Sequence, residues 1–229
     1  MASLNSPSHS AATPQVRNVS TLSRFERNRE KALELFASKG FGQVSLRELA
    51  AHLELTAGAL YHHCSSKEDL LFEFIEEHYE GLLALLPRCA RGGSTLEVVR
   101  NLTAALLRQY QRRPLHFQLA MSESRCLGPL HRQRIGELRE QFHQRLLQHF
   151  GIGPEVDPAL RQGAGQAIAH LLEQMPTWMN HSSLPETERL ALLENLTLGA
   201  VSQLLSHIEN RHPIQSRGFR RAAILRKPA

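Results

Sequence analysis

The protein has 229 residues, of which 41% are apolar and 21% charged, and its formal net charge is +5. These proportions match ordinary globular proteins and exclude collagen-like, mucin-like and wholly disordered chains. Residues 1–70 contain 8 basic and 7 acidic side chains, residues 71–209 contain 13 and 15, and residues 210–229 contain 6 and none. The basic excess therefore lies in a C-terminal tail, so the net charge alone does not indicate what the folded part binds.

Several classes of protein lack their characteristic motifs here. Cys64, Cys89 and Cys126 are too few and too scattered for a disulfide framework or a zinc site, and we expect no metal. The chain has no phosphate-binding glycine loop and no nucleophile elbow, so we predict neither an enzyme nor a bound cofactor. No apolar run reaches the ~18–20 residues of a membrane span, and the N-terminus lacks an apolar signal core. We therefore expect a cytoplasmic protein.

From about residue 22 the apolar residues recur with helical spacing, and no segment alternates as a strand does, which predicts an all-α fold. We expect helices over 22–39, after Ser45, and over 57–63, 67–86, 94–112, 115–126, 129–150, 158–179 and 185–210. Pro87 is expected to end the fourth of them. These boundaries divide the chain into a disordered tail (1–21), a small unit (22–68), a larger helical domain (69–210) and a basic tail (211–229).

Local capping signals mark the short helices near the N-terminus. Gly40 suits the left-handed end of the first helix. Ser45 followed by Glu48 forms a capping box, and Thr56 is an N-cap for the third helix. The segment QVSLRELAAHLELTAGALYHH thus holds a helix of about two turns, a tight turn and a second short helix. That is the spacing of a helix-turn-helix, whose second helix can enter the major groove, although other small helical hairpins share it.

The longer run ALELFASKGFGQVSLRELAAHLELTAGALYHHCSSKEDLL resembles the DNA-binding domain of the TetR family of transcriptional regulators. The resemblance covers about residues 24–75 and includes several elements in order and at matching spacing. It implies a three-helix DNA-binding unit with a helix-turn-helix, joined by a long fourth helix to a larger ligand-binding and dimerisation domain. The number of helices predicted further along the chain agrees with that architecture.

Residue types on and beside the helix-turn-helix suit DNA contact. The small Ala57 and Gly58 allow close approach to bases, while Tyr61 and His62 can donate to phosphates. The predicted DNA contacts are Ser45, Arg47, Thr56, Ala57, Gly58, Tyr61, His62 and Lys67. Alternatives stay open, because Tyr61 could be a packed aromatic, Ser45 only a cap, and Lys67 only a solvated charge.

Four features depart from the family pattern. Glu54 stands where the turn usually has glycine, so either a non-glycine residue adopts a left-handed conformation at a cost of about 1 kcal/mol or the turn has a different conformation. Ala57 replaces a frequent basic DNA contact. Cys64 replaces a core phenylalanine and is expected to be a small buried hydrophobe rather than a redox sensor. Asn28 and Lys31 replace apolar residues of the first helix, which predicts a thinner core contact there.

The segments SKEDLLFEFI and QLAMSESRCLGPLHRQRIGELREQF are similar, more loosely, to TetR-family members that sense acyl-CoA thioesters. An acyl chain needs an apolar tunnel between helices, and coenzyme A phosphates need cations. The alternative is that the apolar residues are simply core. The candidate ligand-binding residues are Leu82, Leu106, Phe117, Met121, Arg125, Phe142 and Trp178.

The last two predicted helices contain small residues and a broad apolar stripe, which favours close helix packing at a subunit interface. By the resemblance, two helices from each subunit form that interface, and the dimer reads a near-palindrome with recognition helices ~34–36 Å apart. The predicted interface residues are Gly163, Ala167, Leu193, Leu196, Ala200, Leu204 and Ile208.

Together these observations predict a homodimeric, ligand-responsive transcriptional regulator, in most members of this family a repressor. It would bind double-stranded operator DNA and be released by a small hydrophobic effector such as an acyl-CoA or a fatty acid. The alternative is a helical module of the same fold that acts through a protein or metabolite partner and binds DNA weakly. Ala57 and the nearly neutral first 70 residues are the reasons to keep that alternative.

Overall fold

The computed structural model describes residues 19–62, 64–89, 95–180 and 183–211. All regular structure within these ranges is helical, which confirms the predicted all-α fold. No described helix is long and apolar enough to cross a membrane. The elements are α1 (Val19–Lys39), η1 (Phe41–Gln43), α2 (Leu46–His52), α3 (Ala57–Tyr61), α4 (Lys67–Cys89), α5 (Thr95–Arg112), α6 (Pro114–Ser122), η2 (Ser124–Cys126), α7 (Pro129–His149), α8 (Pro158–Asn180) and α9 (Glu186–Arg211).

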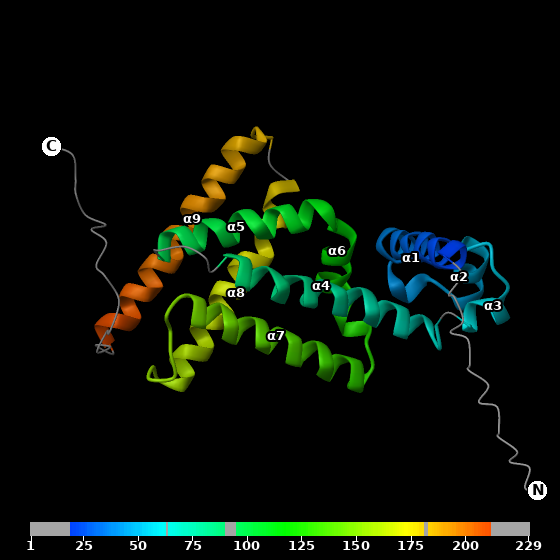
Figure 1. The fold of residues 1–229 in the computed structure, drawn as a ribbon, viewed down its shortest axis with the longest axis horizontal. Helices are drawn as coiled ribbons and strands as arrows, with labels where there is room; N and C mark the ends of the chain where they lie inside the picture. The colour runs from blue at the N-terminus through cyan, green and yellow to red at the C-terminus, as the bar shows by residue number, and fades with distance from the viewer. Residues whose placement is uncertain (1–18, 63, 90–94, 181–182, 212–229) are drawn as a thin grey trace, which may run out of the picture.

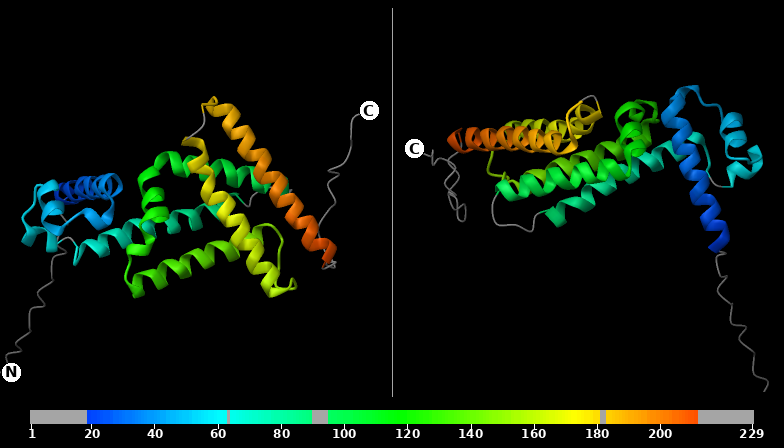
Figure 2. Two further views of the ribbon diagram at one scale, coloured as in Figure 1. Left: turned by 180° about the vertical axis from the view of Figure 1, so that it is seen from behind. Right: turned by 90° about the horizontal axis from the view of Figure 1, so that it is seen from above.

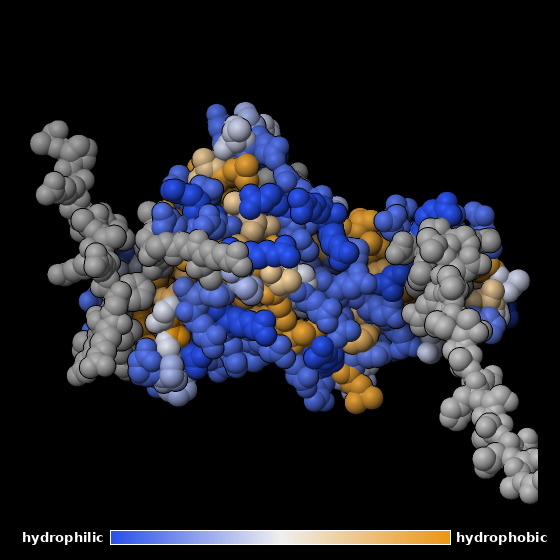
Figure 3. Space-filling model, in the orientation of Figure 1, coloured by the Kyte–Doolittle hydropathy of each residue, from blue (hydrophilic) through white to orange (hydrophobic). Residues whose placement is uncertain are grey.

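The described helices form two parts that share α4. Helices α1, α2 and α3 gather at one end of an elongated molecule, and α4 runs from them into a larger body (Figure 1). Within the body α4 packs against α5, α6 and α7, while α9 packs against α5 and α8. Helices α8 and α9 form an outer layer on the side away from α4 (Figure 2). Most of the face drawn in Figure 3 is hydrophilic, with small apolar patches scattered over it.

The small N-terminal unit is held together by apolar side chains from all of its helices and from α4. The Phe36 ring lies 5.3 Å from the Phe41 ring and 6.4 Å from the Phe74 ring, in both cases edge to face. Leu49 of α2 and Leu60 of α3 are buried in the same core. Because Phe74 belongs to α4, the core of this unit extends beyond the expected boundary at residue 68.

Several helix ends differ from the sequence predictions, among them the start of α1, which lies at Val19 rather than at about residue 22. Helix α4 runs through Pro87 to Cys89 instead of ending before the proline. Proline removes only one backbone N–H, and the last turn of α4 is anchored because Leu86 and Cys89 are both buried. The predicted helix over 115–126 is split, since α6 begins with Pro114 at its first turn, ends at Ser122 and is followed by the short η2.

Candidate DNA-binding unit and effector cavity

The helix-turn-helix is built by local backbone capping. The Ser45 Oγ accepts a hydrogen bond from the Glu48 N–H at 3.1 Å, which begins α2. The Thr56 Oγ1 accepts one from the Ala59 N–H at 3.1 Å, which begins α3. Both predicted N-caps are therefore confirmed. Each cap satisfies one of the N–H groups that the first turn of a helix leaves without an internal partner.

The turn between α2 and α3 depends on a left-handed residue. Glu54 has φ +57°, so the glutamate adopts the conformation that favours glycine. This geometry lets the Leu55 N–H donate to the Ala50 carbonyl at 2.9 Å and close the end of α2. The Glu54 carboxylate lies 3.0 Å from the Lys31 ammonium of α1. Lys31, one of the polar departures in the first helix, thus meets a second departure in the turn.

Nearly all of the predicted DNA contacts are exposed on the small N-terminal unit. Tyr61 is 56% exposed, which excludes the alternative of a packed aromatic, while its neighbour Leu60 is buried. Among the described residues, a Cβ added to Gly58 would meet no atom from elsewhere in the fold within 4 Å, so their packing does not require glycine there. The predicted DNA contacts on and beside α2 and α3 that are exposed are Ser45, Arg47, Thr56, Ala57, Gly58, Tyr61 and His62.

Lys67 differs from these residues because its ammonium is occupied within the protein. The Lys67 Nζ donates to the Phe41 carbonyl at 2.9 Å and to the Val44 carbonyl at 2.6 Å. The same nitrogen lies 4.2 Å from the centre of the Phe41 ring. These contacts tie the start of α4 to the segment between α1 and α2. We therefore place Lys67 in the packing of the unit rather than among the phosphate contacts.

Cys64 has the environment of a buried apolar residue, in agreement with its expected role. It is 8% exposed, and burial is the main reason that the pKa of its thiol is raised. A small cavity with about 10 Å³ of free space borders Cys64, Asn28, Leu53 and Leu60. The small thiol in place of a larger aromatic side chain leaves this space, and the raised pKa disfavours a reactive thiolate.

A second contact connects α1 to the body through ion pairs on α4. The Arg29 guanidinium of α1 pairs with Glu73 and Glu77 of α4. The Glu77 carboxylate also lies 3.3 Å from the His116 Nε2 and 3.5 Å from an Arg113 nitrogen. A hydrogen bond to His116, with the nearby guanidinium groups, lowers the pKa of Glu77. One carboxylate thus joins α1 to the segment between α5 and α6.

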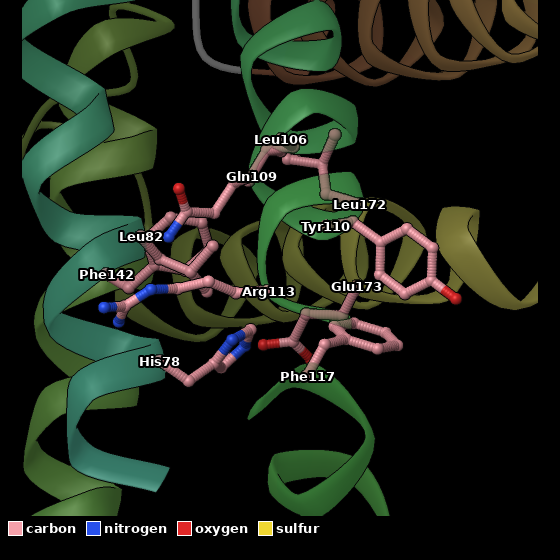
Figure 4. Close-up of a pocket in the computed structure, with 10 residues that line it drawn as sticks. All are labelled: His78, Leu82, Leu106, Gln109, Tyr110, Arg113, Phe117, Phe142, Leu172 and Glu173. Carbon is pink, nitrogen blue, oxygen red and sulfur yellow. The ribbon is translucent and has the colours of Figure 1, made fainter. Parts of the chain in front are cut away.

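The body encloses a cavity between five helices (Figure 4). Its free space is about 20 Å³, which is roughly the room that one buried water molecule needs. An effector can therefore occupy this place only if the lining helices move apart. The lining residues are His78, Leu82, Leu106, Gln109, Tyr110, Arg113, Phe117, Phe142, Leu172 and Glu173.

The structure brings together four of the predicted ligand-binding residues, since Leu82, Leu106, Phe117 and Phe142 all line this cavity. Met121 packs partly buried against the core outside it, and Arg125 is exposed outside it, so neither prediction fits the cavity as it stands. The side chain of Trp178 lies outside the described residues.

Sequence reasoning missed the polar part of the cavity lining. His78 and Glu173 are buried, and burial lowers the pKa of His78 to about 4 and raises the pKa of Glu173. In the sequence, each of these two residues is visible only as one polar side chain, a histidine or a glutamate, within an otherwise apolar helical stripe. Among the described residues no group of His, Cys, Asp and Glu is arranged to hold a metal ion.

The predicted dimer residues divide between two faces of α8 and α9. Leu193 and Ile208 are buried within the protomer, so these two predicted interface residues belong to its core instead. Leu204 is half-buried. Leu196 is 49% exposed. Gly163 and Gly199 have no protein atom within 4 Å of an added Cβ, so packing within the protomer does not explain these glycines. The predicted residues on the outer face are Gly163, Ala167, Leu196 and Ala200.

A capped helix-turn-helix joined by one shared helix to a helical body defines a class of helical DNA-binding regulators. Residues 29–74 match the family model for bacterial regulatory proteins of the tetR family. The chain is 39% identical over 51 residues to YuxN of Bacillus subtilis (strain 168), an uncharacterized HTH-type transcriptional regulator. That match spans 22% of this chain and only 18% of YuxN.

Solved structures extend the likeness to the body. PfmR from Thermus thermophilus, a TetR family transcriptional regulator, is 26% identical, with a TM-score of 0.62 over 79% of this chain and 97% of PfmR. AibR, crystallised in complex with isovaleryl coenzyme A and operator DNA, is 18% identical, with a TM-score of 0.63 over 76% of this chain and 97% of AibR. Residues 29–74 are therefore similar to the DNA-binding domain of the tetR family, and the fold of the chain is similar to that of the TetR-family regulator PfmR.

Proposed function

We propose that the protein is a cytoplasmic, homodimeric repressor that binds a near-palindromic operator and is released by a small hydrophobic effector. The observation that supports this most strongly is the position of α4. Phe74 of α4 belongs to the core of the DNA-binding unit, and His78, one turn later, lines the cavity. Any effector that displaces this part of α4 therefore changes the support of the recognition helix.

The ion pairs around Glu77 provide a second connection between the cavity and the DNA-binding unit. Arg113 lines the cavity and pairs with Glu77, which in turn pairs with Arg29 of α1. An effector that displaces Arg113 as it enters would leave Glu77 with fewer partners and loosen the contact of α1 with α4. The effector then needs a higher affinity for the conformer that fits the operator poorly.

The outer face of α8 and α9 is the proposed dimer interface. It combines the exposed Leu196 with small residues that allow another helix to approach closely. A two-fold dimer through this face would carry two copies of α3, which agrees with a near-palindromic operator. The likeness to AibR makes an acyl-CoA the first specific effector to test.

A second candidate function has one observation in its favour. The exposed residues of α3 and its C-cap include no lysine or arginine, since they are Ala57, Gly58, Tyr61 and His62. A module of this fold that acts through a protein or metabolite partner would need no basic recognition helix. It would bind DNA weakly and without a preferred sequence.

Selection of bound fragments from a genomic library tests the two candidates. We expect the purified full chain to enrich a near-palindromic site, and its affinity for that site to fall steeply with salt as phosphate contacts release counterions. Addition of isovaleryl coenzyme A, fatty acids or apolar alcohols then identifies compounds that release the DNA. Absence of binding to operator-length DNA at ~50 mM salt would contradict the repressor proposal and favour the partner-binding module.

A further inference from the structure

The cavity contains two buried polar atoms that have no hydrogen-bond partner among the described residues. They are the Nε2 of His78 on α4 and the Oε1 of Glu173 on α8. The two side chains are only 5% and 7% exposed. Figure 4 shows both side chains directed toward the lined space from opposite helices. Buried polar atoms in native proteins nearly always have partners, so these two indicate a polar group in the cavity, whose present size leaves room for one water molecule or one hydroxyl.

The surroundings of the two atoms are apolar and largely aromatic. The Phe117 ring lies edge to face with the His78 ring at 5.7 Å and with the Tyr110 ring at 5.1 Å. Leu82 and Leu172 line the same space. Aromatic rings pack well against another ring in offset or edge-to-face geometry. Once the lining helices move apart, these surroundings favour a compact apolar body, preferably with an aromatic ring, that carries a polar group to the His78 and Glu173 atoms.

Charges near the cavity restrict that polar group further. Glu173 is the acidic residue of the lining, and Arg139 of α7 is the charged group that acts on it most strongly. Arg113, the basic residue of the lining, already pairs with Glu77. An anionic headgroup would therefore meet the Glu173 carboxyl without a cation reserved for it. An ammonium group could donate to Glu173, but it has donors alone, so it could satisfy the His78 Nε2 only in the tautomer that leaves this nitrogen without a proton, whereas a hydroxyl suits both tautomers.

We propose that the effector is a compact apolar molecule with a single hydroxyl group, such as a phenol or an alcohol. The hydroxyl donates to the Glu173 Oε1 and completes the hydrogen bonding of the His78 Nε2, because a hydroxyl has one donor and two acceptor sites. This inference rests on the proposed function, since it specifies the ligand of the same cavity. Such a ligand would bridge α4 and α8 and would act directly on the helix shared with the DNA-binding unit.

A matched series of probes separates this class from the others. The probes are 4-butylphenol, 4-butylbenzoate, 4-butylbenzylammonium, butylbenzene and isovaleryl coenzyme A. We expect 4-butylphenol to bind at least about tenfold more tightly than butylbenzene, as loss of one buried hydrogen-bonding group implies. At about 100 times its Kd it should raise the Tm by about 5–10 °C and release operator DNA.

Variants of the two polar residues test whether the hydroxyl is recognised where we place it. In the full chain, Glu173→Leu and His78→Phe should each reduce the preference for 4-butylphenol over butylbenzene to within about threefold. Both replacements are apolar, so the cavity should still bind butylbenzene. Glu173→Gln should keep most of the preference, because the amide oxygen still accepts a hydrogen bond. Glu80→Gln is the matched control, since Glu80 is exposed on α4 and does not line the cavity.

Tighter binding of 4-butylbenzoate, 4-butylbenzylammonium or isovaleryl coenzyme A than of 4-butylphenol would overturn the hydroxyl assignment and leave the regulator proposal intact. The assignment would equally be overturned by an unchanged preference in both Glu173→Leu and His78→Phe, or by the absence of any thermal shift in a protein that still binds its operator. Phenol binding that depends on both residues, in a protein that does not bind DNA, would support the cavity inference and contradict the proposed function.

Discussion

Replacement of Lys67 by methionine distinguishes a packing role from a phosphate contact. Methionine keeps most of the aliphatic chain and removes the ammonium, which donates to two carbonyls at 2.9 and 2.6 Å and lies over the Phe41 ring. Each hydrogen bond to a charged group contributes about 1.5–3 kcal/mol, and a cation over a ring adds about 0.5–1 kcal/mol. Because Lys67 is only half-buried, solvent weakens these contacts. We therefore expect the substitution to lower the free energy of unfolding by about 2–3 kcal/mol, which is less than the sum of the three contributions.

For a chain of this length that loss corresponds to a decrease in Tm of about 4–12 °C, which differential scanning calorimetry measures directly. The salt dependence of operator binding, measured at 10 °C where the variant is folded, should stay unchanged. A lost phosphate contact would instead lower the slope of log K against log salt by about 0.9 per protomer.

The control is Arg47→Met, at an exposed position on α2. It should lower that slope by about 0.9 per protomer and change the unfolding free energy by no more than about 0.5 kcal/mol. The reverse pattern for Lys67→Met, with a lower slope and an unchanged Tm, would show that the ammonium leaves the carbonyls and contacts DNA.

Thr56→Ala removes the N-cap of α3 and should lower the free energy of unfolding, measured by urea denaturation, by about 1 kcal/mol. Thr56→Ser should keep the cap, so equal stability of the two variants would contradict the capping role. His78 binds its proton only near pH 4 in the folded protein and near pH 6.5 when unfolded, so stability falls as pH decreases between these values. Relative to His78→Phe, the protein should therefore lose about 3 kcal/mol from pH 7 to pH 4, and a constant difference would refute the assignment. Leu196→Asp should convert the dimer to a monomer in sedimentation velocity, while Leu130→Asp, at an 82% exposed leucine on α7, should not; a dimeric Leu196→Asp protein would exclude the proposed face.

The capping residues show why much of the DNA-binding unit could be predicted from the sequence. Ser45 and Thr56 each bond to a backbone N–H three residues further along the chain, so the partner is already present in the local sequence. The resemblance places glycine at the position of Glu54, and the structure gives this residue the left-handed φ that glycine favours. Helix formation is governed by residues within about four positions, which are visible without the fold.

Assignments that depend on distant partners could not be made in this way. Lys67 has the appearance of a surface cation, but its acceptors lie 23 and 26 residues earlier in the chain. Leu193 and Ile208 have the same apolar character as Leu196, and only the packing of α9 against α5 and α8 separates the buried residues from the exposed one. A helical stripe shows that a face is apolar but not which surface covers it.

The amino-acid sequence by itself determined the all-α architecture, the capped helix-turn-helix and the resemblance of residues 29–74 to the tetR family model. The tertiary structure alone decided that the Lys67 ammonium serves the protein's own carbonyls. It also placed His78 and Glu173, far apart in the sequence, at one cavity without hydrogen-bond partners among the described residues. The physical reason is one of range, because backbone capping acts over a few residues, whereas burial and polar satisfaction depend on which helices come together.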